Sequence, residues 1–490
     1  MRVPFLLPVA LLAATALSGC TVGPDFERPQ APADGAYGRT EDPVAPPAGA
    51  PAAALGEGPG ARWWTAFGSP QLDALVERAM ANNRTLAASN ATLTAARAEL
   101  RAVAGKRLPQ VDANARVEQE QINLSSFGFA GNEALGTAGN PEFQLYSVGG
   151  GISYDLDLFG GLRRQVEQSA AQAEAQQRQT EAAHLSIAGQ VVNQVLTVAA
   201  IRAQIATANA LLADDMRNVT LTQKRREGGE GTLVEVLNAQ SQYAADRGDL
   251  PQLEQQLAEA RHLLATLVGV APADLGPSDL DLAAITLPAS IPVTLPSALV
   301  HRRPDILQAE ADLHAATAQI GVATARLYPD ITLGATLTQG APGIDDLAKN
   351  AFRGYDIFAG LTAPIFHGGT LKAQRAAAID RAKASEATYQ QTVLAAFGQV
   401  ADLLSAIRND ERSVTTQSEA LAVAEHSRRL SRRSFEVGNS GVLQVLESER
   451  LYQRSSNGLL VARTRQFLNV ARLYVATAGG WIGSPPATAN

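Results

Sequence analysis

The chain repeats a long part of its own sequence. Residues Glu227–Tyr243, which read EGGEGTLVEVLNAQSQY, have a counterpart in Glu436–Tyr452, which read EVGNSGVLQVLESERLY, 209 residues further on. Each copy contains a Gly-rich turn with long helical sequence on both sides. Because both halves must then solve the same structural problem, this duplication constrains the fold more than any single motif does.

An apolar residue recurs at every seventh position in both halves. A strict seven-residue repeat is typical of helices that wind around partners along a coiled-coil seam. The positions are Val191, Val198, Ile205 and Leu212 in the first half and Val400, Ile407, Val414 and Leu421 at the same offset in the second.

Two very long helices are predicted, over residues 163–227 and 370–437, since neither stretch contains proline. At a rise of 1.5 Å per residue, the first is about 100 Å long. Two further helices return over residues 232–268 and 442–478, and a shorter helix is expected over residues 69–106. The long stretches are rich in Ala and Gln, so each helix has only a narrow apolar stripe. Helices of this kind suit a wall that contacts water on both sides.

Four segments alternate between apolar and polar or small residues, as strands do. They are residues 109–122, 143–158, 329–340 and 353–366. Strands of this length are typical of an outer-membrane barrel with a watery lumen, although a soluble antiparallel sheet gives the same alternation. Four strands cannot close a barrel, and open edges are not viable in lipid. The membrane interpretation therefore requires several copies of the chain.

The start of the chain predicts export and lipidation. Arg2 and the apolar run from Val3 to Leu17 form a secretory signal over residues 1–19. The signal ends in Leu-Ser-Gly directly before Cys20, which is a lipobox, and Cys20 is the only cysteine in the chain. Cys20 is thus expected to become the lipid-bearing N-terminus, although an ordinary signal followed by a chance cysteine is the alternative. The residue after Cys20 is Thr21 and not Asp, and this favours export to the outer membrane over retention at the inner membrane.

Composition and motifs exclude several other classes of protein. A single cysteine excludes an intrachain disulfide and a thiolate metal cluster. The net charge of −7 argues against a nucleic-acid partner. No catalytic motif, metal-ligand spacing or dinucleotide fingerprint is present, so neither catalytic nor metal-binding residues are assigned. Outside the signal, no apolar run long enough for a transmembrane helix is expected.

The predicted fold class is α+β, mostly α, with an internal structural repeat. The predicted organisation is a signal peptide (1–19), a lipidated tether (20–60), a first repeat (61–268), a connecting strap (269–303), a second repeat (304–480) and a C-terminal tail (481–490).

Three sequence blocks carry a family resemblance. The start Leu17–Pro29, the segment Arg62–Phe67 and the block Leu295–Asp305 resemble the TolC-like outer-membrane efflux channels, specifically their lipidated branch. The two Gly-rich turns look like the periplasmic tips of that family. The resemblance covers nearly all of the mature chain in the expected order.

The resemblance implies a homotrimer with a twelve-stranded barrel in the outer membrane of a Gram-negative bacterium and an α-helical barrel crossing the periplasm. Such a trimer is the passive exit duct of a tripartite pump for drugs, toxic compounds or metal ions. Its partners would be outer-membrane lipids, a periplasmic adaptor and an inner-membrane transporter, often of the resistance–nodulation–division type. It has no cofactor apart from the lipid on Cys20. The alternative is a lipid-anchored structural or adhesive coiled-coil protein without a pore.

The family closes its pore just after the tip turns. The corresponding positions here are Leu443, Gln444 and Glu447 in the second half and Glu235 and Asn238 in the first. Leu443 and Glu447 are four residues apart and share a helix face. They would form an apolar ring and a carboxylate ring in a trimer, although Glu447 as an ordinary solvated residue is the alternative. The tip turns themselves are marked by Gly228, Gly229, Gly231, Gly438 and Gly441.

Two basic clusters are also prominent. Pro304, after Arg302 and Arg303, is expected at the first turn of a helix, where it has a structural role. Arg428, Arg429, Arg432 and Arg433 precede the second tip, as a solvated face with acidic neighbours on packed helices or as a docking or interchain surface.

Overall fold

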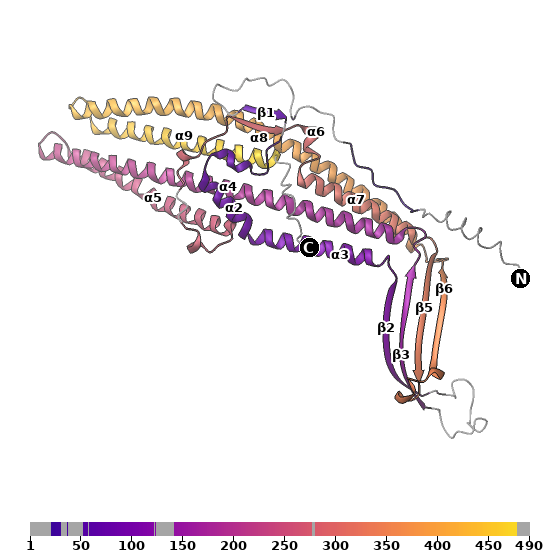
Figure 1. The fold of residues 1–490 in the computed structure, drawn as a ribbon. Helices are drawn as coiled ribbons and strands as arrows, with labels where there is room; N and C mark the ends of the chain where they lie inside the picture. Colours follow the sequence, from indigo (N-terminus) through magenta and orange to yellow (C-terminus); the bar gives the residue numbers. More distant parts are fainter. Residues whose placement is uncertain are drawn as a thin grey trace. The chain divides into compact units, whose positions relative to one another are not determined.

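The structure is a computed structural model that describes residues 21–30, 37, 52–56, 58–121, 123, 142–276 and 280–477 (Figure 1). The chain divides into two compact units. One contains residues 1–28, 94–174 and 311–387, and the other contains residues 29–93, 175–310 and 388–490. The predicted signal peptide, Cys20 and the predicted C-terminal tail lie outside the described residues.

The duplication appears as pairs of helices of equal length. Each long helix is followed by a shorter one that folds back along it as a hairpin (Figure 1). The long helices have 67 residues each, the returning helices 36 each, and the helices before the strands 22 each. The pairs are α4 (Gly161–Glu227) and α8 (Thr370–Glu436), α5 (Leu233–Val268) and α9 (Val442–Thr477), and α3 (Arg84–Gly105) and α7 (Pro304–Ala325).

The helix expected over residues 69–106 is two helices, α2 (Pro70–Asn82) and α3. The break lies at Asn83, whose backbone is extended. The Asn83 side-chain oxygen accepts a hydrogen bond from the backbone N–H of Thr85 at 2.9 Å, and its amide donates to the carbonyl of Leu267 at 2.7 Å. Asn83 therefore begins a new helix and ties it to α5, which a periodicity argument cannot show.

The four predicted strands are confirmed, and they form one antiparallel sheet in the order β2-β3-β5-β6. Their bounds are β2 Gln110–Gln121, β3 Glu142–Asp155, β5 Asp330–Ala341 and β6 Arg353–Thr362. The strands β2 and β6 are the two edges.

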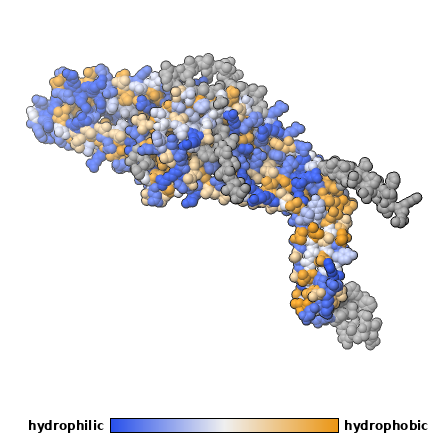
Figure 2. Space-filling view, viewed as in Figure 1, coloured by the Kyte–Doolittle hydropathy of each residue, from blue (hydrophilic) through white to orange (hydrophobic). Residues whose placement is uncertain are grey.

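The register gives the sheet one mostly apolar face and one mostly polar face, although the polar face also carries Phe143 and Phe358. Directly opposed residues share a face, and one row across the four strands is Val111, Ile152, Ala335 and Ile357. Large apolar side chains of this face stay exposed. In Figure 2, hydrophobic residues form separate patches on the visible surface of the sheet, with hydrophilic residues between them. The next row, on the other face, is Asp112, Gly151, Thr336 and Asp356.

Two strands end earlier than the alternation predicted. The strand β3 stops at Asp155 because Asp157 turns the chain into α4, with φ at +46° and its carboxylate accepting the backbone N–H groups of Leu162 and Arg163 at 2.8 and 2.9 Å. The strand β6 stops at Thr362, shortly before Pro364, which has no N–H to donate to a ladder.

A second, small sheet was not predicted. Strand β1 (Ala52–Gly56) lies in the segment expected to be an irregular tether, and it pairs in parallel with β4 (Ser290–Thr294) in the expected strap. The strap also contains the short helices η4 (Pro272–Asp274), η5 (Leu282–Ala284) and α6 (Pro296–Leu299).

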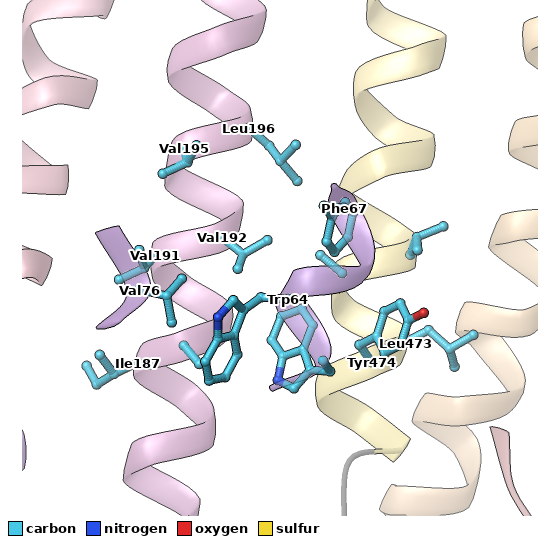
Figure 3. Packing of buried hydrophobic residues seen from close by; sticks show 14 of the residues in the cluster. Trp64, Phe67, Val76, Ile187, Val191, Val192, Val195, Leu196, Leu473 and Tyr474 are labelled. Atoms are coloured by element: carbon cyan, nitrogen blue, oxygen red, sulfur yellow. The ribbon is translucent and has the colours of Figure 1, made fainter. Parts of the chain in front are cut away.

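The main hydrophobic core surrounds the short helix η1 (Trp63–Phe67). Trp63 stacks on Tyr474 with ring centroids 5.5 Å apart, and Trp64 and Phe67 are fully buried. Figure 3 shows Trp64, Phe67 and Tyr474 in one cluster with Val191, from the predicted seven-residue seam. The seam therefore faces the core at this level of α4.

One helix contains a longer apolar run than the sequence led us to expect. In the described part of the chain, α4 alone contains an 18-residue window long and apolar enough to cross a membrane. The expectation that no such run exists outside the signal was therefore too strict. Val195 and Leu196 of α4 belong to the hydrophobic core, but only 28% of the apolar window is buried in the described chain.

Candidate pore constriction at the helix turns

Both helix hairpins reverse direction at a glycine in the left-handed region. Gly229 has φ of +80° and Gly438 has φ of +81°, so the two turns use the same backbone device at corresponding positions. An L side chain is strained there, which explains why both copies have glycine.

The first turn leads into a capping box at the start of α5. The hydroxyl of Thr232 accepts the backbone N–H of Glu235 at 3.3 Å, and the Glu235 carboxylate accepts the backbone N–H of Thr232 at 2.8 Å. Glu235, predicted as a pore-lining carboxylate, is thus engaged in starting its own helix.

The second turn has a small core of its own. Phe435, Val442, Val445 and Leu446 are buried together. Arg225 of the first hairpin donates a hydrogen bond to the carbonyl of Phe435 at 3.2 Å and lies over its ring at 4.6 Å. The two turns are therefore joined by contacts within one chain.

A buried ion-pair network lies behind the turns. Asp214 pairs with Arg428 at 2.9 Å and with Arg432 at 3.5 Å. Glu449 accepts from Arg432 at 2.6 Å and from Asn218 at 2.6 Å. Asp214 and Glu449 thus each have a cationic partner on another helix, as buried charges require.

The four-arginine cluster therefore divides. Arg428 and Arg432 face acidic groups on packed helices, as the first interpretation holds, and Arg428 also lies 3.9 Å from the ring centroid of Tyr452. Arg429 and Arg433 are exposed, and Arg429 pairs with Glu425 on its own helix at 3.6 Å.

The residues predicted to line the constriction point away from their own chain's core. Leu443 is 64% exposed, Gln444 is exposed, and the Glu447 side chain is 61% exposed. Arg450, one turn further on, reaches Glu447 at 3.4 Å. Arg450 was not identified from the sequence, although its i, i+3 spacing from Glu447 indicates such a pair. The arginine partly offsets the negative charge of Glu447.

Asp215 was also missed. It is only 1% exposed, and neither carboxyl oxygen accepts a hydrogen bond from any donor in the described structure. Burial raises the pKa of Asp215 to about 8, and the nearby carboxyl groups of Asp246, Glu449 and Asp214 raise it in the same direction. Asp215 lies three residues after Leu212, at the other core position of the seven-residue repeat. This position could have indicated that Asp215 is buried.

Comparison with known proteins identifies the family. The family described as outer membrane efflux protein matches twice in succession, over residues 75–270 and 295–479. The chain belongs to this family. The two matched ranges correspond to the two copies of the duplicated sequence.

Several relatives of this efflux protein are similar over nearly their whole length. The pyoverdine export outer membrane protein OpmQ of Pseudomonas aeruginosa is 32% identical over 420 residues, covering 86% of this chain and 87% of that protein. The cation efflux system protein CusC of Escherichia coli K12 is 27% identical over 479 residues, covering 97% and 99%. The solved outer-membrane channel OprN has a TM-score of 0.82 and 28% identity, covering 94% of this chain and 100% of that one.

The efflux protein is therefore an outer-membrane channel subunit of a tripartite efflux system, and it extends into the periplasm of a Gram-negative bacterium. Its relatives are efflux channels and not enzymes. Among the residues that the structure describes, no group of three or more His, Cys, Asp or Glu side chains is placed to hold a metal ion.

Proposed function

We propose that three copies of the chain close into a single twelve-stranded barrel and form a passive exit duct. The sheet order supports this, because β2 and β6 each have one unpaired edge, and an unpaired edge is not viable in lipid. Every neighbouring pair is antiparallel, so β6 of one copy can pair with β2 of the next without breaking the alternation.

The observation that carries the proposal is the exposed apolar face of the sheet. Val111 is 74% exposed and Ile357 is 77% exposed, at opposite ends of one row across the four strands. The reverse face presents Asp112 and Asp356. A soluble sheet would bury the apolar face, whereas a barrel in lipid exposes it and keeps the polar face toward a wet lumen.

The cargo is proposed to be chosen elsewhere in the pump. Relatives of similar sequence are named for pyoverdine export, toluene efflux and cation efflux. One channel architecture thus occurs with very different solutes. We assign selection to an inner-membrane transporter of the resistance–nodulation–division type, with a periplasmic adaptor joining it to the duct.

We place the resting constriction at Leu443, Gln444 and Glu447. Their exposure in the single chain leaves them free to meet the same residues of two other copies. Rings of apolar side chains gate by dewetting, and carboxylate rings favour cations. Because Glu235 caps its own helix, it is the weaker candidate.

We further propose that Cys20 carries the lipid anchor. The lipobox in the sequence supports this assignment. Mass spectrometry of the mature protein tests it. An acylated Cys20 at the N-terminus is expected, and an unmodified start at another residue would refute it.

Assembly and pore formation are tested together. The protein in mild detergent should have the mass of a trimer and should conduct ions in planar bilayers. A monomer without conductance would refute the trimeric barrel.

The assignment of the sheet faces has a matched test on one strand. Ala115→Arg places a charge on the apolar face of β2, at a cost of about 2–4 kcal/mol if that position is deep in the bilayer. Asn114→Arg places the same charge on the opposite face. Membrane assembly should fall only for Ala115→Arg, and equal effects would refute the assignment.

A further inference from the structure

The N-terminal segment of the described chain is held by a buried arginine. Arg164 of α4 is only 3% exposed. Its Nε donates to the carbonyl of Val22 at 3.2 Å, and one terminal nitrogen donates to the carbonyl of Gly23 at 3.3 Å and to the carboxylate of Asp25 at 2.7 Å. Three bonds from one guanidinium thus fix three of four successive residues.

The same segment approaches α7 closely. A Cβ atom on Gly23, which has φ of +95°, would lie 2.5 Å from the Cα of Gly321. A Cβ atom on Gly321 would in turn meet the side chain of Arg164 at 2.6 Å. Both glycines are therefore required for the chain to reach the arginine.

A second contact holds the segment further along. Phe26 stacks on the ring of His314 with centroids 4.4 Å apart. Glu167 joins the two contacts, because one carboxylate oxygen lies 2.7 Å from Arg164 and the other lies 3.1 Å from Nε2 of His314. The clasp, defined here as Arg164, Glu167, His314 and Gly321, thus grips residues 22–26 from two helices.

The clasp lies where the strands meet the helices. The backbone N–H of Val22 donates to the carbonyl of Phe159 at 3.2 Å, a few residues after β3 ends. Phe159 and Pro364 line one cavity of about 450 Å³ at this junction. Beside Pro364, the side chains of Ile365 and Phe366 are 91% and 87% exposed. In membrane barrels, girdles of aromatic side chains flank the apolar band, and Phe366 occupies such a position just beyond the end of β6.

We infer that Arg164 is a positioning residue for the lipid anchor: the clasp fixes residues 22–26 so that acyl chains on Cys20 enter the bilayer beside the strand–helix junction. This inference rests on the proposed lipidation of Cys20. Two residues of chain span about 7 Å at most, so the anchor cannot move far from Val22. The short connection between Cys20 and Val22 therefore keeps the anchor beside the sheet of its own chain.

The test measures how tightly the segment is held. Because Cys20 is the only natural cysteine and is acylated in the proposal, Val22→Cys introduces the only free thiol. The bonds that hold Val22 come from its backbone, so the substitution keeps them. Its reaction rate with a water-soluble maleimide is measured on the full-length protein in detergent, with and without Arg164→Ala. Loss of the clasp should raise the rate about tenfold or more, because labelling follows the population of the open segment.

Arg163→Ala is the matched control. It removes the same side chain from the adjacent position, where Arg163 makes a 4.0 Å pair with Asp157 and has a side chain that is 43% exposed. Gly23→Ala is a second test that changes no charge, and it should also raise the rate. Labelling at the parental rate in both Arg164→Ala and Gly23→Ala would overturn the clasp.

Two further measurements separate this inference from the proposed function. Mass spectrometry reports acylation, and native mass and conductance report the trimeric duct. Arg164→Ala should leave acylation, trimer and conductance in place while releasing the segment. An unacylated Cys20 in the parent protein would overturn the anchor and its positioning, whereas a failure to form trimers in every variant would overturn the duct.

Discussion

Replacing Asp215 by asparagine should make the stability of the protein less sensitive to pH. The carboxyl group is 1% exposed, has no donor in the described structure and faces Asp246, Glu449 and Asp214. Burial raises its pKa from 3.8 to about 8. The folded chain must therefore keep this group protonated at neutral pH, at a cost that the unfolded chain does not bear.

The stability penalty that Asp215 carries is set by its two pKa values. The penalty is absent below the unfolded pKa of 3.8, grows as the pH rises, and becomes constant above about 8. At 1.36 kcal/mol per pKa unit, it reaches about 4 kcal/mol per chain at neutral pH. The asparagine side chain of the Asp215→Asn variant stays neutral throughout. The stability advantage of this variant over the parent should therefore grow from acid to neutral pH.

The measurement is denaturation of the trimer followed by far-ultraviolet circular dichroism across this pH range. Asp249→Asn is the control, because Asp249 is an exposed aspartate on the same helix as Asp246. The duplication supplies a natural comparison, since the residue 209 positions after Asp215 is Ala424, which is also buried. Parallel pH profiles for the parent and Asp215→Asn would refute the reasoning.

Four other changes test the turns and the core. Leu443→Ala should widen the apolar constriction and raise single-channel conductance, and unchanged conductance would move the constriction elsewhere. Glu447→Gln should weaken the preference for cations, with reversal potentials in a salt gradient as the measurement. Thr232→Ala removes one half of the capping box and should cost about 1 kcal/mol, seen as a lower denaturation midpoint. Trp64→Ala should cost about 3–5 kcal/mol by leaving a cavity in the main core, and a loss below about 1 kcal/mol would contradict that packing.

The regular elements could be predicted because their patterns are local. The alternation in residues 353–366 located the start of β6 at Arg353, and the lack of proline located α4 and α8 almost to the residue. The apolar face of the sheet followed from the same alternation, because the period of two determines both strand and face.

The features that were missed depend on pairing across long distances. The strand β1 is recognisable only beside β4, more than two hundred residues away. The break at Asn83 depends on the carbonyl of Leu267, and the burial of Arg164 depends on a segment at the start of the chain. Arg164 also looks like any other arginine on a helix until its acceptors are known. The cap at Glu235 could have been predicted, because Thr232-Leu-Val-Glu235 has the sequence signature of a capping box. Glu235 as a residue of the pore constriction stays a prediction.

The equal lengths of the two hairpins have a consequence for any partner that meets the turns. In a trimer, three copies of each hairpin would present six turns with nearly the same backbone, since Gly229 and Gly438 adopt the same conformation. The side chains do not follow that symmetry, because Glu230 stands in one turn where Asn439 stands in the other. A ring-shaped partner would therefore contact six turns that have nearly the same backbone shape and alternate in charge. It could distinguish neighbouring turns by electrostatics alone.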